Sequence, residues 1–150
     1  CRAKFKIIGD GGKRKELEYA IANLSLTNVE LIPPVARDKL IEEYTKADVL
    51  FLHLNDYSAF KKVLPSKLFE YAATGKPIWA GLKGYSAHFV SSEIIGCQVF
   101  LPGNIADAID KFDALKFNVE PRIEFSQKFN RDNIMGEMVL NILRLKQDNA

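Results

Sequence analysis

The sequence has few cysteines, no long hydrophobic run and no excess of charge of one sign. Its two cysteines, Cys1 and Cys97, supply neither a disulfide framework nor the spacing of a zinc site, which is typical of a protein in a reducing compartment. No apolar segment approaches the ~20 residues that a membrane-spanning helix needs, and the opening CRAKFKII lacks the form of a signal peptide. We therefore expect a soluble, cytoplasmic protein.

The charge balance also argues against two classes of partner, nucleic acids and membrane surfaces. Twenty-one lysines and arginines face 19 acids, for a net charge of +2, and the two signs are well mixed. A net charge of this size produces too weak an electrostatic field for a protein that binds nucleic acid or a membrane surface. The chain has 150 residues, of which 47% are hydrophobic and 27% are charged. This length and composition are typical of one globular domain. Because the chain begins with Cys1 shortly before an apolar segment, we expect a piece of a longer protein.

Short apolar segments alternate with segments that have helical periodicity. Continuous apolar runs of this kind are typical of strands buried on both faces of a parallel sheet. Strands that alternate with helices predict an α/β fold, a Rossmann-like doubly wound parallel sheet with right-handed crossovers. The predicted strands are KFKIIG (4–9), NVELI (28–32), DVLFLHL (48–54), PIWAG (77–81) and CQVFL (97–101). After them comes a long amphipathic tail at 122–146.

In such a sheet, ligands bind at the carboxyl ends of the strands, so the loops there are the candidate sites. The first is the turn GDGG, where Gly11 and Gly12 let the backbone turn tightly and leave amide hydrogens for an anion or a polar ligand. Lys13 to Lys15 follow in the first helical turn, where cations oppose the helix dipole unless an anion lies nearby. An ordinary turn beside a solvated basic face explains the same residues equally well.

The segment VLPSKLFEYAATGKPIWA (63–80) carries the sharpest signal. Pro65 suits the first turn of a helix, Ser66 can cap its amides, and Gly75 stands where the helix should stop. Glu70 lies one turn into the helix, where its two oxygens can accept hydrogen bonds from the two hydroxyls of a ribose. Simple compensation of the helix dipole by Glu70 is an equally good explanation on spacing alone, and Lys67 is either a phosphate counter-charge or a solvated lysine.

Three segments in order, FKIIGDGGKRKELE, NVELIPPVARDKLIEEYTKADVLFLHL and VLPSKLFEYAATGKPIWA, resemble the carboxyl-terminal half of a bacterial nucleotide-sugar glycosyltransferase. The family is the large retaining group 1 type, built from two facing Rossmann domains in the architecture called GT-B. The resemblance covers nearly the whole chain. It implies that residues 1–150 are one half of that architecture, the donor-binding domain. Relatives with a PSKLFEY segment often build cell-surface polysaccharides such as O-antigen or capsule.

The resemblance also implies roles for residues. Glu70 matches the second glutamate of a paired motif, which holds the donor ribose, and the first glutamate is replaced here by Lys62. That replacement leaves the donor sugar open. Leu64 to Lys67, with Ser66 between them, match the segment that approaches the diphosphate and sugar.

Two further positions match the family's nucleotide site. Val35 matches a position whose backbone meets the nucleobase, and Gly11 lies in the matching glycine turn. The implied reaction is transfer of a hexosyl or N-acetylhexosaminyl group to an acceptor hydroxyl. We expect a UDP-sugar donor rather than a GDP-sugar, with no prosthetic group and no required metal.

The resemblance implies missing parts as well. The family's diphosphate-neutralising arginine and lysine belong to a first strand-helix unit, and the acceptor site belongs to an amino-terminal domain. Neither is in this sequence, so we expect the fragment to be inactive alone. The acceptor, a glycan or lipid-linked sugar, and any attachment to the inner face of the membrane would depend on the missing domain.

Two other hypotheses stay open. The chain is alternatively a non-catalytic Rossmann-like module that binds a nucleotide, or a flavodoxin-like interaction module without a ligand. Against a signalling receiver, the strands end in Gly9-Asp10 and Asn55-Asp56 without the acidic cluster that a phosphoacceptor site needs.

Overall fold

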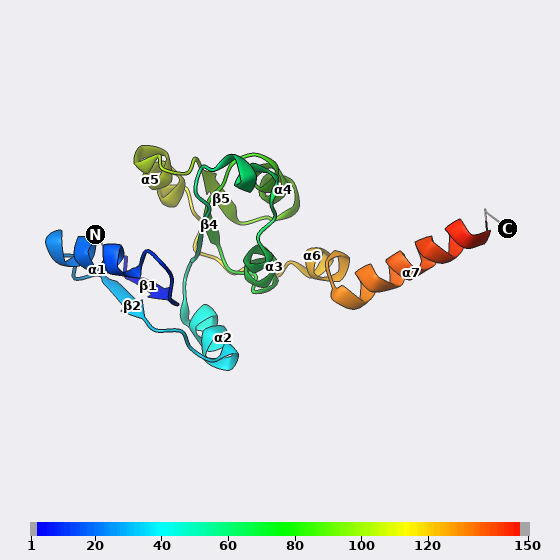
Figure 1. Ribbon diagram of the computed structural model, residues 1–150, viewed down its shortest axis with the longest axis horizontal. Coiled ribbons are helices and arrows are strands. Elements are labelled where there is room, and N and C mark those ends of the chain that lie inside the picture. Colours follow the sequence, from blue (N-terminus) through cyan, green and yellow to red (C-terminus); the bar gives the residue numbers. More distant parts are fainter. Residues whose placement is uncertain (1–2, 148–150) are drawn as a thin grey trace. The chain divides into compact units, whose positions relative to one another are not determined.

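The computed structural model describes residues 3–147, so Cys1 lies outside the described residues. The chain divides into two compact units, residues 1–43 and 44–150, and each is described by itself. The first unit contains β1 (Phe5–Ile8), α1 (Arg14–Asn23), β2 (Val29–Ile32) and most of α2 (Arg37–Lys46). Its strands are parallel, with Phe5 opposite Val29 and Ile8 opposite Ile32, and α1 connects them (Figure 1).

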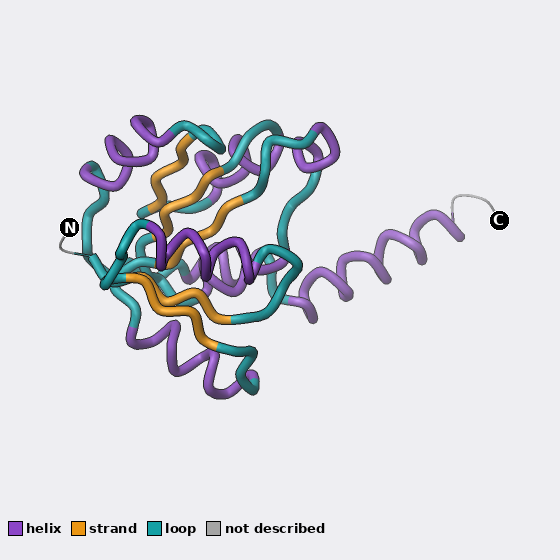
Figure 2. The backbone as a smooth tube through the Cα atoms, turned by 60° about the vertical axis from the view of Figure 1, so that its left-hand side comes forward, coloured by secondary structure: helices purple, strands orange, loops and turns teal. Residues whose placement is uncertain are grey.

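The second unit contains a parallel sheet of β3 (Leu50–His53), β4 (Ile78–Gly81) and β5 (Cys97–Phe100), in that order. A 3-10 helix, η1 (Ser58–Lys62), and α3 (Ser66–Ala73) connect β3 to β4, and α4 (Tyr85–Glu93) connects β4 to β5. The remaining helices are α5 (Ile105–Asp113), α6 (Ile123–Lys128) and α7 (Arg131–Gln147). Figure 2 shows the strands as extended segments among helices.

The predicted α/β class with parallel strands is therefore confirmed. All the predicted strand segments contain an observed strand of four residues. Within the described residues, however, these strands form two sheets, β1-β2 and β3-β4-β5. Periodicity indicates which segments are strands, but the pairing of strands is a tertiary property that it does not contain.

The core of the second unit lies between the sheet and its helices. Successive crossovers in the same direction place α3 and α4 on one face. Leu50 and Ile78 are buried on the strands, and Leu68 of α3 and Val90 of α4 are fully buried. The indole nitrogen of Trp79 donates to the carbonyl of Ala108 at 3.1 Å, which places α5 against the other face.

A cluster of phenylalanines joins α6 to the helices of this unit. Phe69 of α3 lies 5.8 Å from Phe89 of α4 and 6.0 Å from Phe125 of α6, measured between ring centroids. Phe129 lies 4.6 Å from Phe125. The cluster packs α3 against α4 and α6.

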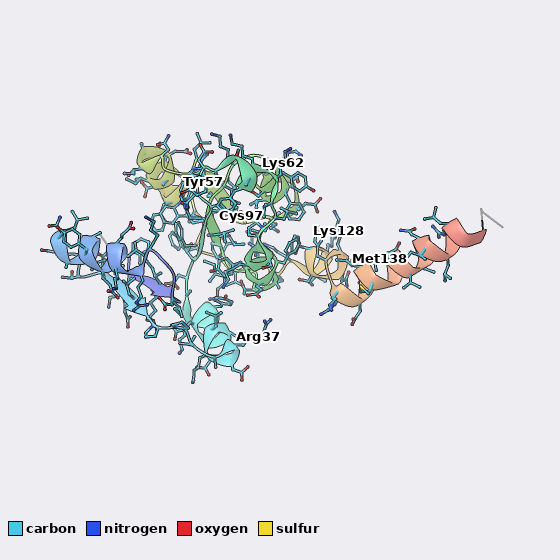
Figure 3. All side chains as sticks on the ribbon, in the orientation of Figure 1. Arg37, Tyr57, Lys62, Cys97, Lys128 and Met138 are labelled. Atoms are coloured by element: carbon cyan, nitrogen blue, oxygen red, sulfur yellow. The ribbon has the colours of Figure 1, made fainter. Side chains whose placement is uncertain are left out.

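The carboxyl-terminal tail differs in one respect from the predicted single amphipathic segment. A break at Phe129 and Asn130 divides it into α6 and α7. On α7, Met138 and Leu143 are about half exposed, and Met138 is labelled in Figure 3. No described helix is both long and apolar enough to cross a membrane.

Candidate functional site

The candidate site in the second unit lies at the carboxyl edge of β3-β4-β5. It is made of the loop after β3, η1, the first turn of α3, the end of β4 and the first turn of α4. This is the edge at which parallel α/β sheets bind their ligands, because successive loops converge there.

The first turn of α3 has no capping side chain. Pro65 is the N-cap residue, in an extended conformation with ψ of 130°, and Ser66 is the first residue of the helix. The expectation that Ser66 caps the amides is therefore wrong, because a helical residue at this position points away from the first amide hydrogens. Gly75, by contrast, is left-handed with φ of 74°, as the predicted helix stop requires.

The next helix begins uncapped as well. Gly84 is the N-cap of α4 with φ of 72° and no side-chain hydrogen bond. A Cβ at Gly84 would lie 2.5 Å from the carbonyl oxygen of Lys61, so η1 approaches α4 so closely that only glycine fits. The start of α5 is different, since Asn104 accepts a hydrogen bond from the Asp107 amide at 3.0 Å. Helices α3 and α4 of the candidate site therefore begin without a capping side chain, as α1 and α6 also do, whereas α5 is capped by Asn104.

Glu70 and Lys67 meet at a buried tyrosine. The Lys67 ammonium donates to the hydroxyl of Tyr44 at 3.0 Å, and this hydroxyl donates to Glu70 Oε2 at 3.4 Å. Tyr44 also packs edge-on against Tyr71, with ring centroids 5.2 Å apart. Burial raises the pKa of Tyr71 to about 12, with the nearby Tyr44 and Glu70 adding to the shift. The structure therefore brings Glu70 and Lys67 together through a residue that the sequence did not assign to the site.

His53 ends β3 with its ring over Gly81, where a Cβ would overlap His53 Cδ2. The ring also lies 6.2 Å from that of Phe51 and 6.0 Å from that of Phe100. Burial lowers the pKa of His53, which favours the neutral imidazole. His53 is therefore a partly exposed aromatic wall of this edge.

Asp56 and Lys83 join the loops that follow β3 and β4. Lys83 Nζ lies 2.8 Å from Asp56 Oδ2, and this hydrogen bond lowers the pKa of the carboxyl group. Lys62, in the last turn of η1, is exposed, and Leu64 is half-buried between η1 and α3. Figure 3 labels Lys62. Lys62 leaves a cationic side chain exposed at this edge, while Asp56 balances the charge of Lys83.

The other two predicted site residues lie in the first unit. The amide of Gly11 donates to Asp10 Oδ1 at 2.9 Å, so the expectation that this amide is left for a ligand is wrong. Val35 is 38% exposed in the loop between β2 and α2. The structure thus fixes Gly11 and Val35 within one unit, and the five residues from Lys62 to Glu70 within the other.

The cations at the start of α1 are paired with acids. Lys13 Nζ lies 2.6 Å from Glu16 Oε1, and Arg14 Nε lies 2.9 Å from Glu18 Oε1. These surface pairs account for the basic first turn without an anion.

Two important residues were missed by the sequence analysis. Tyr44 was given no role. Arg122 had no role, yet it is 6% exposed and donates to the carbonyls of Ile95, Ala72 and Lys76 at 2.8, 3.0 and 3.0 Å. A buried guanidinium must find hydrogen-bond acceptors. The sequence shows neither that Arg122 is buried nor which carbonyl groups accept from it.

Three further features concern metal binding, thiol reactivity and a cavity. Within residues 3–147 no group of three or more His, Cys, Asp and Glu could hold a metal ion. Burial raises the pKa of the Cys97 thiol to about 12, which makes it a poor nucleophile. A cavity of about 410 Å³ lies at the opposite end of α3, lined by Thr74, Gly75 and Arg122 among others, and it contains none of the predicted site residues.

A family model described as glycosyl transferases group 1 matches residues 2–131 of this chain. The chain belongs to this family. The match ends at the first residue of α7. Neither the curated proteins nor the solved structures contain a match.

Membership in the glycosyl transferases group 1 family identifies the chain as part of a sugar-transfer enzyme. The α/β fold with parallel strands is consistent with a Rossmann-like half of the GT-B architecture. Nucleotide-sugar donors and acceptor substrates are implied for the family, which favours the glycosyltransferase hypothesis over a ligand-free interaction module.

Proposed function

We propose that this chain is the donor-binding domain of a bacterial retaining glycosyltransferase. It binds a nucleoside diphosphate sugar, and the enzyme transfers the hexosyl or N-acetylhexosaminyl group to an acceptor hydroxyl in cell-surface polysaccharide synthesis. An amino-terminal domain and a first strand-helix unit, outside this sequence, supply the acceptor site and further phosphate ligands. The isolated domain therefore binds the donor without turnover.

The observation that carries this proposal is the position of Glu70. Its carboxylate lies one turn inside α3, half-buried at the carboxyl edge, with Oε2 oriented by the hydroxyl of Tyr44. A carboxylate offers about four acceptor positions, and the contact with Tyr44 uses one of them. If Glu70 only compensated the dipole of α3, no buried tyrosine would be needed to orient its carboxylate.

The uncapped first turn of α3 supports a diphosphate site next to this ribose site. Its first amide hydrogens and the positive end of the helix dipole attract an anion, and the diphosphate is the anion of the donor. Ser66 and Leu64 belong to the segment that approaches it, and Lys67 is near enough to Glu70 to serve both groups. In this role Ser66 contributes its amide rather than a capping hydroxyl.

In the reaction, these groups stabilise the leaving diphosphate. Charge on the diphosphate increases as its bond to the sugar breaks, and donors already oriented toward it favour that state over the bound substrate. The helix amides and cationic side chains take the part that a metal ion takes in other enzymes, so no metal is required. Val35 and Gly11 are proposed to contact the nucleobase and the nucleotide, respectively, from the first unit.

Calorimetric titration of UDP and GDP tests the proposal. In the full-length protein, we expect saturable binding of one nucleotide, UDP in preference to GDP. Glu70→Gln should weaken this binding by about 1.5 to 3 kcal/mol, as for hydrogen bonds to a charged group. Glu137→Gln, on an exposed position of α7, is the matched control and should leave it unchanged. Binding that survives Glu70→Gln at full strength would contradict the role of Glu70.

A further inference from the structure

Tyr44 occupies an unusual place for a polar-ended side chain. It lies in the last turn of α2 and is only 9% exposed, while most of the residues around it on that helix are exposed. Its ring is fixed by the edge-on contact with Tyr71. Burial of the ring is explained by packing, but burial of the hydroxyl requires hydrogen-bond partners.

Lys67 and Glu70 are these partners, and their chemistry allows one arrangement. An ammonium group has only hydrogens to donate, and a carboxylate has only lone pairs to accept them. The Tyr44 hydroxyl therefore accepts from Lys67 at 3.0 Å and donates to Glu70 at 3.4 Å. The Lys67 ammonium also lies over the Tyr44 ring, 5.7 Å from its centroid.

This arrangement changes what Glu70 does. Lys67 and Glu70 are three residues apart on α3, a spacing at which opposite charges attract each other directly. The Tyr44 hydroxyl lies between them. It accepts a hydrogen bond from the ammonium, and its own hydrogen bond draws one carboxylate oxygen, Oε2, toward Tyr44. The Tyr44 hydroxyl, held in place by a buried ring, then contributes to the orientation of the carboxylate.

We propose that Tyr44 is a positioning residue that orients the Glu70 carboxylate for the two hydroxyls of the donor ribose. The inference rests on the proposed role of Glu70. It assigns Tyr44 no contact with the substrate, and it makes the effect of Tyr44 dependent on the hydroxyls of the sugar.

The test compares Tyr44→Phe with the unchanged full-length protein, using UDP and 2′,3′-dideoxy-UDP as probes, or the guanosine pair if GDP binds better. Tyr44→Phe keeps the ring and removes the hydroxyl. We expect affinity for the ribonucleotide to fall about fivefold, as for loss of one hydrogen bond. Affinity for the dideoxynucleotide should not change, because it has no hydroxyl for Glu70 to bind. Tyr19→Phe, at an exposed position of α1, is the matched control.

The alternatives give different results. Equal weakening for both nucleotides would mean that Tyr44 has a structural role alone, and this overturns the inference. Unchanged ribonucleotide binding in Tyr44→Phe, together with weakened binding in Glu70→Gln, overturns the inference and leaves the proposed function in place. Unchanged binding in Glu70→Gln contradicts the proposed function itself.

A double variant gives a second, independent measurement. Because Tyr44 acts through Glu70, we expect Tyr44→Phe added to Glu70→Gln to cause no further loss of ribonucleotide affinity. Losses that add in full would overturn the inference. Thermal unfolding of each variant shows that the comparison is made between folded proteins.

Discussion

The two edges of the β3-β4-β5 sheet are built in opposite ways. At the amino edge, Arg122 donates to three carbonyl groups, and Lys76 Nζ donates to the carbonyl of Ala47 at 2.6 Å. At the carboxyl edge, α3 and α4 begin without capping side chains, and Lys62 and Lys83 lie exposed nearby. At the amino edge, cationic side chains hold carbonyl groups together, and at the carboxyl edge α3 and α4 leave their first amides without a capping side chain. The difference separates a stabilising edge from the edge at which we propose that the donor binds.

The largest effect should come from breaking the amino edge. Arg122→Met removes donors from the carbonyls of Ile95, Ala72 and Lys76, two of which precede strands and one of which ends α3. Leaving such groups unpaired should lower the free energy of unfolding by about 3 kcal/mol. Denaturant-induced unfolding of Arg122→Met and of the unchanged protein measures this loss. Arg131→Met, an exposed arginine, is the control and should change stability by less than about 0.5 kcal/mol. Equal effects of the two substitutions would show that the Arg122 contacts contribute nothing.

A smaller effect is expected from distorting the carboxyl edge. Gly84→Ala combines a left-handed backbone with a Cβ that meets the Lys61 carbonyl, and should cost about 2 kcal/mol of stability and displace η1 from α4. Gly103→Ala has a similar φ of 79° with nothing within 4 Å, so it should cost only about 1 kcal/mol.

The difference between these two variants therefore isolates the close approach of η1 to α4. If Gly84→Ala and Gly103→Ala destabilise equally, η1 moves aside without cost. Nucleotide titration of the same pair sharpens the comparison, because only Gly84→Ala should also weaken binding at the carboxyl edge.

The smallest effect concerns the ion pair between Asp56 and Lys83. The pKa of Asp56 is lowered by its hydrogen bond to Lys83, so the folded state holds this proton less tightly than the unfolded state. The pair's contribution to stability is therefore present above the ordinary aspartate pKa and is lost as the pH falls through the lowered value. NMR titration should show that Lys83→Gln raises the pKa of Asp56. An unchanged Asp56 pKa in Lys83→Gln would show that the pair does not form in solution.

Much of the local structure could be predicted from the sequence. Each predicted strand segment contains a strand, and the helix predicted within 63–80 is observed at Ser66–Ala73 and stops before Gly75. For the site, the sequence identified Glu70 and Lys67 as neighbours on one helix, but it predicted a helix cap at Ser66 that the structure does not show, and it gave no reason to include Tyr44.

The sequence by itself determined which segments are strands and helices and where α3 stops, because apolar periodicity and the conformational freedom of Gly75 act over a few residues. The tertiary structure decided which strands pair, which carbonyls Arg122 binds and which hydroxyl orients Glu70. Arg122 and Ala72 are 50 positions apart in the chain, and Tyr44 and Glu70 are 26 apart. Such contacts depend on how helices and strands pack in space, and no local pattern of residues specifies them.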